Sequence, residues 1–376
     1  MMTALMGSTI EAVLMTAPGR PLERRRVDLP RPRPGGAILE TVASEVCGTD
    51  VHLWHGRLAG VPYPIIPGHV SVGRLLESDG SGRSVVDVEG STIAPGTLVT
   101  FYDVFGACGA CWQCAVARAP NRCPKRRVYG ITAGAGDGLL GGWAERIEIL
   151  PGVRVVPLPD GIDEADFLGG GCGLPTGFHA VERAGVALGD TVVVQGSGPV
   201  GLNAAIFAQL AGALRVFVVG APEARLEAAR RLGAEDVLDI AAVSTPEDRV
   251  RWVRDRTSGR GADVVIEASG NPAAVPEGLE MLRDAGRYVI VGHYTDSGET
   301  ALNPHSHVNR KHATILGCWG YEFTHLHRSL AMMARYAARF RWRELVTREY
   351  GLGQAQEALE DMERLAVVKA LIRPGR

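Results

Sequence analysis

The sequence has only three lysines, at positions 125, 311 and 369, and its acidic and basic residues nearly cancel to a formal net charge of −2. It therefore lacks the excess of positive charge that nucleic acids or anionic membrane surfaces attract, which favours a small molecule as the partner. It also lacks any run of about 18 consecutive apolar residues, so we expect no membrane-spanning helix.

The first fifteen residues contain no basic region followed by a sustained apolar run, so we expect no secretory signal and a cytoplasmic protein. The seven cysteines would then be reduced, and spaced cysteines in such a compartment indicate metal binding or catalysis more often than disulfides. The 376 residues, 46% hydrophobic and 22% charged, are enough for two domains with separate cores.

Four cysteines cluster in the stretch "CGACWQCAVARAPNRC", at Cys108, Cys111, Cys114 and Cys123. Four thiolates from one short segment are the ligand set of a closed, structural zinc site. A zinc ribbon that binds nucleic acid is the less favoured interpretation, because only Lys125, Arg126 and Arg127 are basic beside the cluster.

The other three cysteines, Cys47, Cys172 and Cys318, lie far apart in the sequence. A catalytic zinc usually has three protein ligands from separate segments and leaves its fourth position open. Cys47, His69 and Cys172 could form such a set. Long-range ligands have no spacing signature, however, and each residue read singly could be a buried cysteine or histidine.

A dinucleotide-binding motif lies in "DTVVVQGSGPVGLNAAIFAQLAGALRVFVVG". An apolar run at 191–194 predicts a buried strand, Gly196, Gly198 and Gly201 form G-x-G-x-x-G, and a helix of small residues follows. The glycines would permit a tight turn, close approach of a pyrophosphate and packing of the helix on the strand. The start of the helix would attract the phosphates.

Further strand and helix patterns alternate downstream of this motif, including "ADVVIEASG" and "RYVIVGHY". They predict an α/β fold with a doubly wound parallel Rossmann sheet, which we assign to residues 161–312. The segment before it, with Val, Gly and Pro at short intervals, predicts a mostly β domain.

Six motifs occur in the order found in zinc-containing medium-chain alcohol dehydrogenases, the group of sorbitol and threonine dehydrogenases: "CGTDVH", "PGHVSVG", the cysteine cluster, "CGLPTG", "GSGPVGL" and "RLEAARRLGA". The chain resembles this family from about residue 11 to 374. The resemblance implies a GroES-like catalytic domain over residues 1–160 and 313–376 and a homodimer or homotetramer. It also implies NAD(P)-dependent interconversion of a secondary alcohol or polyol with its ketone or aldehyde.

The resemblance assigns roles to the site residues. The catalytic zinc ligands would be Cys47, His69 and Cys172. Thr49 and His52 fall where a hydroxyl and an imidazole pass the alcohol proton to solvent, and Asp50 falls where a carboxylate orients the histidine ligand. The cofactor residues would be Thr176, Gly196, Gly198, Val200, Gly201, Gly220, Arg225, Gly292 and Lys369. Among these, Thr176, Val200 and Gly292 match nicotinamide contacts, and Lys369 matches a basic residue near the pyrophosphate.

Gly220 departs from the family at the end of the second strand, where an acidic residue normally binds the adenosine ribose. An acid there favours NAD, and its absence removes the discrimination against a 2′-phosphate. Arg225 would favour NADP and Glu223 would oppose it, so we expect either cofactor, with a slight preference for NAD.

Two further departures concern the metal sites. Val70 stands where the family has a Glu thought to help ligand exchange at zinc, and the last gap of the cysteine cluster is one residue longer than usual, which a loop tolerates. Two other classes stay open: a zinc-free quinone or enoyl reductase, and a catalytically silent dinucleotide-binding protein. The presence of Cys47, His69 and Cys172 argues against the first, and Val70 alone hints at the second.

Overall fold

The structure is a computed structural model that describes residues 8–78 and 85–376. The chain forms two compact units. The first contains the described residues up to Gly171 together with Glu322–Ala334 and Trp342–Arg376, and the second contains Cys172–Tyr321 and Arg335–Arg341. In the described ranges, no helix combines the length and the apolar character that crossing a bilayer requires.

The unit boundaries lie about ten residues beyond the domain limits of 161 and 313 drawn from the sequence. Helix α3 (Glu164–Gly170) belongs to the first unit, because Gly169 packs so closely on the backbone of Trp342 that a Cβ there would lie 2.1 Å from the Trp342 carbonyl oxygen. Strand β15 (Thr314–Gly317) belongs to the second unit, because it pairs with β14 (Leu282–Ile290).

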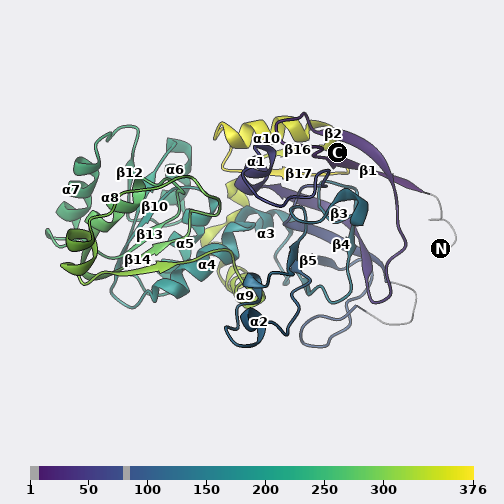
Figure 1. The fold of residues 1–376 in the computed structure, drawn as a ribbon, viewed down its shortest axis with the longest axis horizontal. Coiled ribbons are helices and arrows are strands. Elements are labelled where there is room, and N and C mark those ends of the chain that lie inside the picture. Colours follow the sequence, from purple (N-terminus) through teal and green to yellow (C-terminus); the bar gives the residue numbers. More distant parts are fainter. Residues whose placement is uncertain (1–7, 79–84) are drawn as a thin grey trace. The chain divides into compact units, whose positions relative to one another are not determined.

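The second unit contains a six-stranded, all-parallel sheet in the order β12–β11–β10–β13–β14–β15 (Figure 1). The other strands are β10 (Thr191–Gln195), β11 (Arg215–Gly220), β12 (Asp236–Asp239) and β13 (Ala262–Glu267). Its helices are α4 (Gly173–Ala184), α5 (Pro199–Leu210), α6 (Glu223–Arg231), α7 (Pro246–Arg256), α8 (Ala274–Met281) and a π-helical turn, Pro304–Asn309. The strand order reverses at β10, so the predicted doubly wound Rossmann sheet is confirmed.

The first unit contains a seven-stranded sheet in the order β16–β17–β3–β4–β5–β9, with β8 also paired to β3. Its strands are β3 (Ala37–Val46), β4 (Ser71–Ser78), β5 (Leu98–Phe101), β8 (Arg146–Ile149), β9 (Val155–Pro157), β16 (Val346–Tyr350) and β17 (Lys369–Ile372). Two antiparallel two-stranded sheets, β1 (Thr9–Leu14) with β2 (Glu23–Asp28) and β6 (Val104–Phe105) with β7 (Arg127–Val128), complete the mostly β domain that the sequence predicts.

The helices of the first unit are short: α1 (Gly48–Trp54), α2 (Trp112–Ala115), α3 and α10 (Ala355–Glu363). Helix α9 (Phe323–Phe340) passes from the first unit into the second. Among the described residues of this unit, 3-10 turns cover Pro120–Arg122, Ala135–Asp137, Trp342–Leu345 and Leu352–Gln354.

Strand β3 is the element that positions the candidate site. In Figure 1 the yellow C-terminal strand β17 lies beside the purple β3, and their antiparallel register pairs Glu45 with Leu371. Leu39, Ala43 and Val46 of β3 are fully buried. A strand paired on both sides and buried in this way holds the residues at its end in fixed places, and β3 ends next to Cys47.

Candidate active site

A cluster of metal-binding side chains forms where β3 ends. One ligand atom each from Glu45, Cys47, His69 and Cys172 lies within 4.8 Å of the other three. Cys172 is bonded to Gly171, the last residue of this part of the first unit, so the chain itself carries it to the cluster. The structure thus brings together the three expected ligands and adds a fourth residue, Glu45.

Cys47 is held by the start of helix α1. Its backbone is extended (φ −114°, ψ 160°) as the residue that precedes the helix, and its N–H donates to the Asp50 carboxylate at 2.8 Å. The Thr49 hydroxyl lies 3.7 Å from the Cys47 sulfur. Asp50 is fully buried, and burial raises the pKa of its carboxyl to about 7. Asp50 therefore fixes the loop that presents both Cys47 and Thr49.

His69 lies in the loop before β4 and is buried. Its Nε2 is 3.7 Å from Glu45 Oε1, and its Nδ1 has no hydrogen-bond partner among the described residues. Burial alone would lower the pKa of His69, but a hydrogen bond to Cys47 and the charges of Cys47, Asp50 and Glu45 raise it to about 10. The cluster therefore favours a positive charge at this point.

The donor set fits a zinc ion. Two sulfurs and an imidazole nitrogen are the ligands of a catalytic zinc with an open fourth position. The negative groups that raise the pKa of His69 would also attract a metal cation, because both effects come from negative charge around a buried site. A ligand set of this kind also disfavours the zinc-free reductase interpretation.

Glu45 is the member of this cluster that the sequence analysis did not expect. Its side chain is fully buried, and Oε2 accepts a hydrogen bond from Lys369 Nζ at 2.5 Å. The only sequence signal was a single acid in the apolar run "VASEV" directly before Cys47.

Lys369 was expected at the pyrophosphate. The structure instead buries it in the first unit with its ammonium on Glu45. Its contact with a phosphate stays a prediction, which this burial disfavours.

His52 and His55 lie on and after α1 and have different surroundings. His52 is half-buried with Nδ1 3.5 Å from Arg57 Nη1, and burial followed by the charge of Arg57 lowers its pKa. A neutral imidazole that borders solvent suits the proton-accepting role expected for His52. The His55 Nε2 atom pairs with Glu363 at 2.5 Å, which gives this residue a structural contact.

The four clustered cysteines form a second metal-binding group within a short lobe. Sulfur–sulfur distances are 3.5 Å for Cys111–Cys114, 3.8 Å for Cys111–Cys123 and 3.7 Å for Cys123–Cys108. Tetrahedral zinc with Zn–S bonds of about 2.3 Å places its sulfurs about 3.8 Å apart, and a disulfide would need about 2.05 Å. The geometry therefore suits a closed zinc site.

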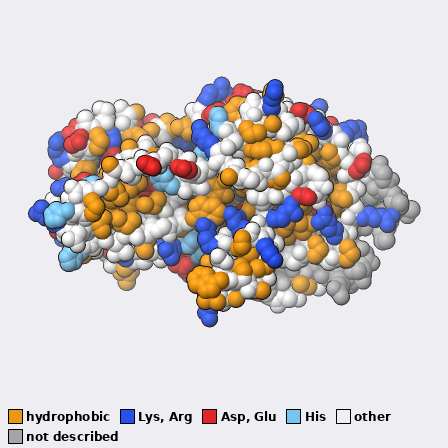
Figure 2. Space-filling model, viewed as in Figure 1, with side chains coloured by type: hydrophobic (Ala, Val, Ile, Leu, Met, Phe, Trp, Pro, Cys, Tyr) orange, Lys and Arg blue, Asp and Glu red, His pale blue; other side chains and the backbone are white. Residues whose placement is uncertain are grey.

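The lobe that contains these cysteines also carries apolar side chains at its surface. Figure 2 shows hydrophobic side chains gathered over α2, where Trp112 and Val116 are 66% and 63% exposed.

The glycine motif of the second unit is shaped by close packing. Gly196 has φ +111°, and a Cβ there would lie 2.8 Å from the backbone of Ala268. A Cβ at Gly201 would lie 1.9 Å from the Gly196 carbonyl oxygen. Gly198 precedes α5, and the nearest atom to a Cβ there is Arg225 Nη1 at 3.9 Å. The protein thus needs glycine at 196 and 201, whereas at 198 it leaves space for a ligand.

The remaining cofactor candidates also lie in the second unit, at strand ends and helix starts. Thr176 on α4 donates its hydroxyl to the Cys172 carbonyl at 2.7 Å, and Val200 is in the first turn of α5. A Cβ at Gly292 would lie 2.3 Å from the Gly270 nitrogen. At Gly220, the last residue of β11, a Cβ would lie 2.6 Å from the Ser197 hydroxyl, so this position has no room for an acidic side chain.

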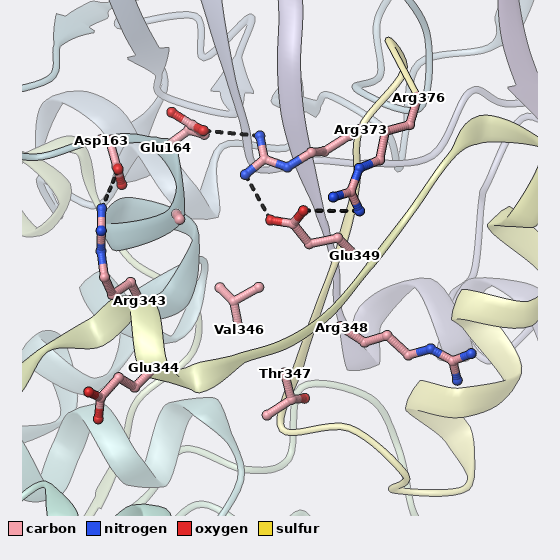
Figure 3. Close-up of a pocket in the computed structure, with 11 residues that line it drawn as sticks. Asp163, Glu164, Arg343, Glu344, Val346, Thr347, Arg348, Glu349, Arg373 and Arg376 are labelled. Carbon is pink, nitrogen blue, oxygen red and sulfur yellow. Dashed lines mark hydrogen bonds and ion pairs between the residues drawn. The ribbon is translucent and has the colours of Figure 1, made fainter.

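A separate pocket in the first unit contains none of the expected site residues (Figure 3). Arg373 bridges Glu164 and Glu349, at 3.0 and 2.8 Å, and Arg376 also pairs with Glu349. Because its arginines and carboxylates neutralise one another, this pocket presents no net charge for an ionic ligand.

Comparisons with known proteins agree with the geometry. The family model described as zinc-binding dehydrogenase matches residues 199–335, and that of the alcohol dehydrogenase GroES-like domain matches residues 33–160. The chain is 33% identical to 5-exo-hydroxycamphor dehydrogenase of Pseudomonas putida, covering 91% of this chain and 92% of that one. It is 29% identical to L-threonine 3-dehydrogenase of Pyrococcus horikoshii, covering 95% and 96%.

Solved structures match over the whole length as well. An alcohol dehydrogenase from Thermotoga maritima superimposes with a TM-score of 0.91 at 30% identity, covering 98% of this chain and all of the other. A zinc-binding dehydrogenase from Sinorhizobium meliloti, solved with NADP bound, gives a TM-score of 0.84 at 27% identity, covering 98% of this chain and all of the other.

Substituting the motif glycines should separate fold from cofactor binding. Gly201→Ala should destabilise the protein by about 1–3 kcal/mol, because its Cβ overlaps the Gly196 carbonyl. Gly198→Ala should change stability by less than about 1 kcal/mol and still weaken dinucleotide binding, because its Cβ points into ligand space. Urea unfolding and titration with NAD and NADP measure the two effects. Unchanged dinucleotide affinity in Gly198→Ala would contradict the assignment of this turn.

Proposed function

Because this chain belongs to the family of zinc-binding alcohol dehydrogenases, we propose that its catalytic zinc is held by Cys47, His69 and Cys172 and that a second, structural zinc lies in the cysteine lobe. The chain is an oxidoreductase that interconverts alcohols and carbonyl compounds with NAD(P). The observation that carries the zinc assignment is the convergence of donor atoms from separate segments within 4.8 Å.

In the proposed mechanism, Thr49 and His52 transfer the proton and Asp50 positions the loop that carries them. Zinc in the cluster supplies the Lewis acidity that lowers the pKa of an alcohol. The Thr49 hydroxyl lies beside the Cys47 sulfur, where it can accept the proton of the alcohol. As it does so, Thr49 gives up its own hydroxyl proton, and His52 accepts this second proton at the edge of the solvent. Asp50 keeps the loop in place through the Cys47 N–H. NAD(P), for which Thr176, Val200 and Gly292 are the proposed nicotinamide contacts, would serve as the acceptor of the hydride that leaves the alcohol carbon.

We propose a secondary alcohol or polyol as the substrate. Support comes from relatives named as dehydrogenases of 5-exo-hydroxycamphor, of L-threonine at position 3, and of erythritol and L-threitol. The test is a panel of secondary alcohols, polyols and matching ketones, assayed with NAD and NADP separately on zinc-loaded protein. Absence of turnover across this panel would count against the proposal.

Cysteine substitutions should separate the two metal sites. Cys47→Ser should lose one zinc per chain and reduce activity at least about 100-fold, because a ligand is removed. Cys108→Ser is the matched control, and it should lower thermal stability while residual folded protein stays active. Metal analysis and activity are measured on the same samples, and a Cys47→Ser protein that kept both zincs and full activity would refute the assignment.

The pH dependence of alcohol oxidation should reflect His52. Its pKa is lowered below the ordinary 6.5, so the imidazole is neutral and able to accept a proton at pH 7, and this ability is lost as the pH falls through the lowered value. We expect the acidic limb of kcat/KM to lie below pH 6.5. His52→Gln should reduce kcat/KM on the order of 100-fold at pH 7 and remove that limb. An unchanged profile in His52→Gln would assign the limb to another group.

For the cofactor, we propose that both NAD and NADP are accepted, with NAD slightly preferred. Gly220 offers no carboxylate to the ribose, and the Glu223 carboxylate pairs with Arg230 at 2.5 Å. The preference for NAD should become strong in the double variant Ser197→Gly/Gly220→Asp. The first change removes the side-chain contacts at 2.6 and 2.8 Å, and a small backbone shift then has to relieve the contact of the new Cβ with the nitrogen of residue 197 at 2.8 Å. Like-charge repulsion of about 1 kcal/mol or more should lower kcat/KM for NADP roughly fivefold or more. Ser197→Gly alone is the control, and an equal loss with both cofactors would contradict the placement of Gly220 at the ribose.

We propose a cytoplasmic location and a homodimer or homotetramer. None of the seven cysteines forms a disulfide in the structure, which suits a reducing compartment. Sedimentation of the purified protein tests the oligomeric state, and a monomer would contradict it.

A further inference from the structure

Glu45 is the member of the catalytic cluster to which the proposed function gives no task. It comes from β3, two residues before Cys47, and its side chain is completely buried. Its two carboxylate oxygens point to different partners. Oε1 lies 3.7 Å from His69 Nε2, and Oε2 lies 2.5 Å from Lys369 Nζ. The carboxylate therefore joins the metal-binding atoms on one side to a buried ammonium on the other.

The backbone around this pair is adapted to it. Gly171, the residue before Cys172, has φ +52°, and a Cβ there would lie 1.7 Å from Glu45 Oε2 and 2.5 Å from Lys369 Nζ. The segment that delivers Cys172 thus leaves room for the ion pair only because it has glycine at 171. Lys369 begins β17, whose register with β3 brings it to Glu45.

Stability alone is a poor explanation for such a pair. Removing two charges from water is costly, and apolar side chains of similar volume often stabilise a protein as well as a buried ion pair does. A buried carboxylate beside thiol and imidazole donors is, by contrast, a good ligand for a divalent cation.

The position of Glu45 also bears on Val70. The Glu45 N–H donates to the Val70 carbonyl at 3.0 Å, so the two residues are neighbours across the backbone. Val70 is buried and apolar, at the position where the family resemblance leads us to expect a Glu. The carboxylate that the family has at position 70 is thus absent here, while Glu45, in the neighbouring position, places a carboxylate in the metal-binding cluster.

We propose that Glu45 is an additional, exchangeable ligand of the catalytic zinc and that Lys369 is a positioning residue that limits how strongly Glu45 binds the metal. This inference rests on the proposed function, in which the cluster holds zinc. The Lys369 ammonium attracts Oε2 and so weakens the bond that the Glu45 carboxylate can form with the metal. Glu45 can therefore leave the metal when an alcohol binds. In this chain Glu45 takes the place of the Glu missing at position 70.

The two residues should then have opposite effects on the metal. Glu45→Gln should weaken zinc binding at the catalytic site by about 10- to 100-fold, in the range seen when groups around a metal are changed. Lys369→Met should strengthen zinc binding and slow its release, because the carboxylate loses its competing cation. The double variant should behave like Glu45→Gln. A purely structural ion pair predicts the same direction for both single variants.

The experiment measures metal binding rather than turnover. Zinc release to a chromophoric chelator gives affinity and rate, and the visible absorption of protein with cobalt(II) in the catalytic site reports a change in its ligands. Glu148→Gln is the matched control, because Glu148 is also buried and paired with an arginine, Arg33 at 3.2 Å, but lies outside the cluster. It should leave both readouts unchanged.

A rescue variant keeps the proposal testable if Lys369→Met fails to fold. Adding Val70→Glu to Glu45→Gln should restore zinc affinity at least in part, because it returns a carboxylate to the neighbouring position. Wild-type affinity and an unchanged cobalt spectrum in Glu45→Gln would overturn the proposal. Weaker NAD binding with unchanged metal binding in Lys369→Met would overturn the role of Lys369 and assign it to the pyrophosphate.

These outcomes are separable from those of the proposed function. If the wild-type cluster binds zinc and responds to Glu45→Gln but no alcohol is oxidised, the activity is wrong and the ligand assignment stands. If the wild-type cluster binds no zinc, both are refuted.

Discussion

Buried negative charge has to be matched by positive charge, and much of the first unit is arranged around this requirement at one place. Glu45 and Asp50 are carboxylates with no exposure to water, and they lie beside the sulfur of Cys47. Unpaired, such groups would cost several kcal/mol each. Lys369 balances Glu45, and the charges of Cys47, Asp50 and Glu45 raise the pKa of His69 against the effect of burial. The zinc proposed for this cluster would supply further positive charge.

The backbone also approaches closely around the cluster. Gly68, with φ +90°, lies before His69, and a Cβ there would be 2.5 Å from both the Ser44 hydroxyl and the ring of Trp143. Gly171 likewise leaves space for the Glu45–Lys369 ion pair because it has no side chain. Segments far apart in the sequence can pack this closely only where they carry no side chain. The indole N–H of Trp143 then donates to the Glu45 carbonyl at 3.1 Å, which fixes the end of β3.

The sequence predicted what depends on local pattern. The doubly wound sheet followed from alternating strand and helix signals, and the cysteine lobe followed from four thiols in one short segment. Cys47, His69 and Cys172 needed a family resemblance, because their contacts join distant segments. Glu45 was missed because a single Glu in a strand gives no sign that its side chain points inward. Lys369 was assigned from its position alone, which does not specify the partner that its ammonium meets.

The contrast between the two metal groups follows from how their ligands are supplied. In the lobe, four sulfurs from one loop can fill a tetrahedral shell completely, so such a site has no place for a substrate. In the cluster at the end of β3, two sulfurs and one nitrogen leave one place open, and the nearest further donor, Glu45, is already held by an ammonium. A ligand that has a second partner can leave the metal at little cost, because it keeps a hydrogen bond when it does. The backbone hydrogen bond from Glu45 to Val70 places the two residues side by side, and under the proposal above the carboxylate at 45 serves where the acid at 70 is missing.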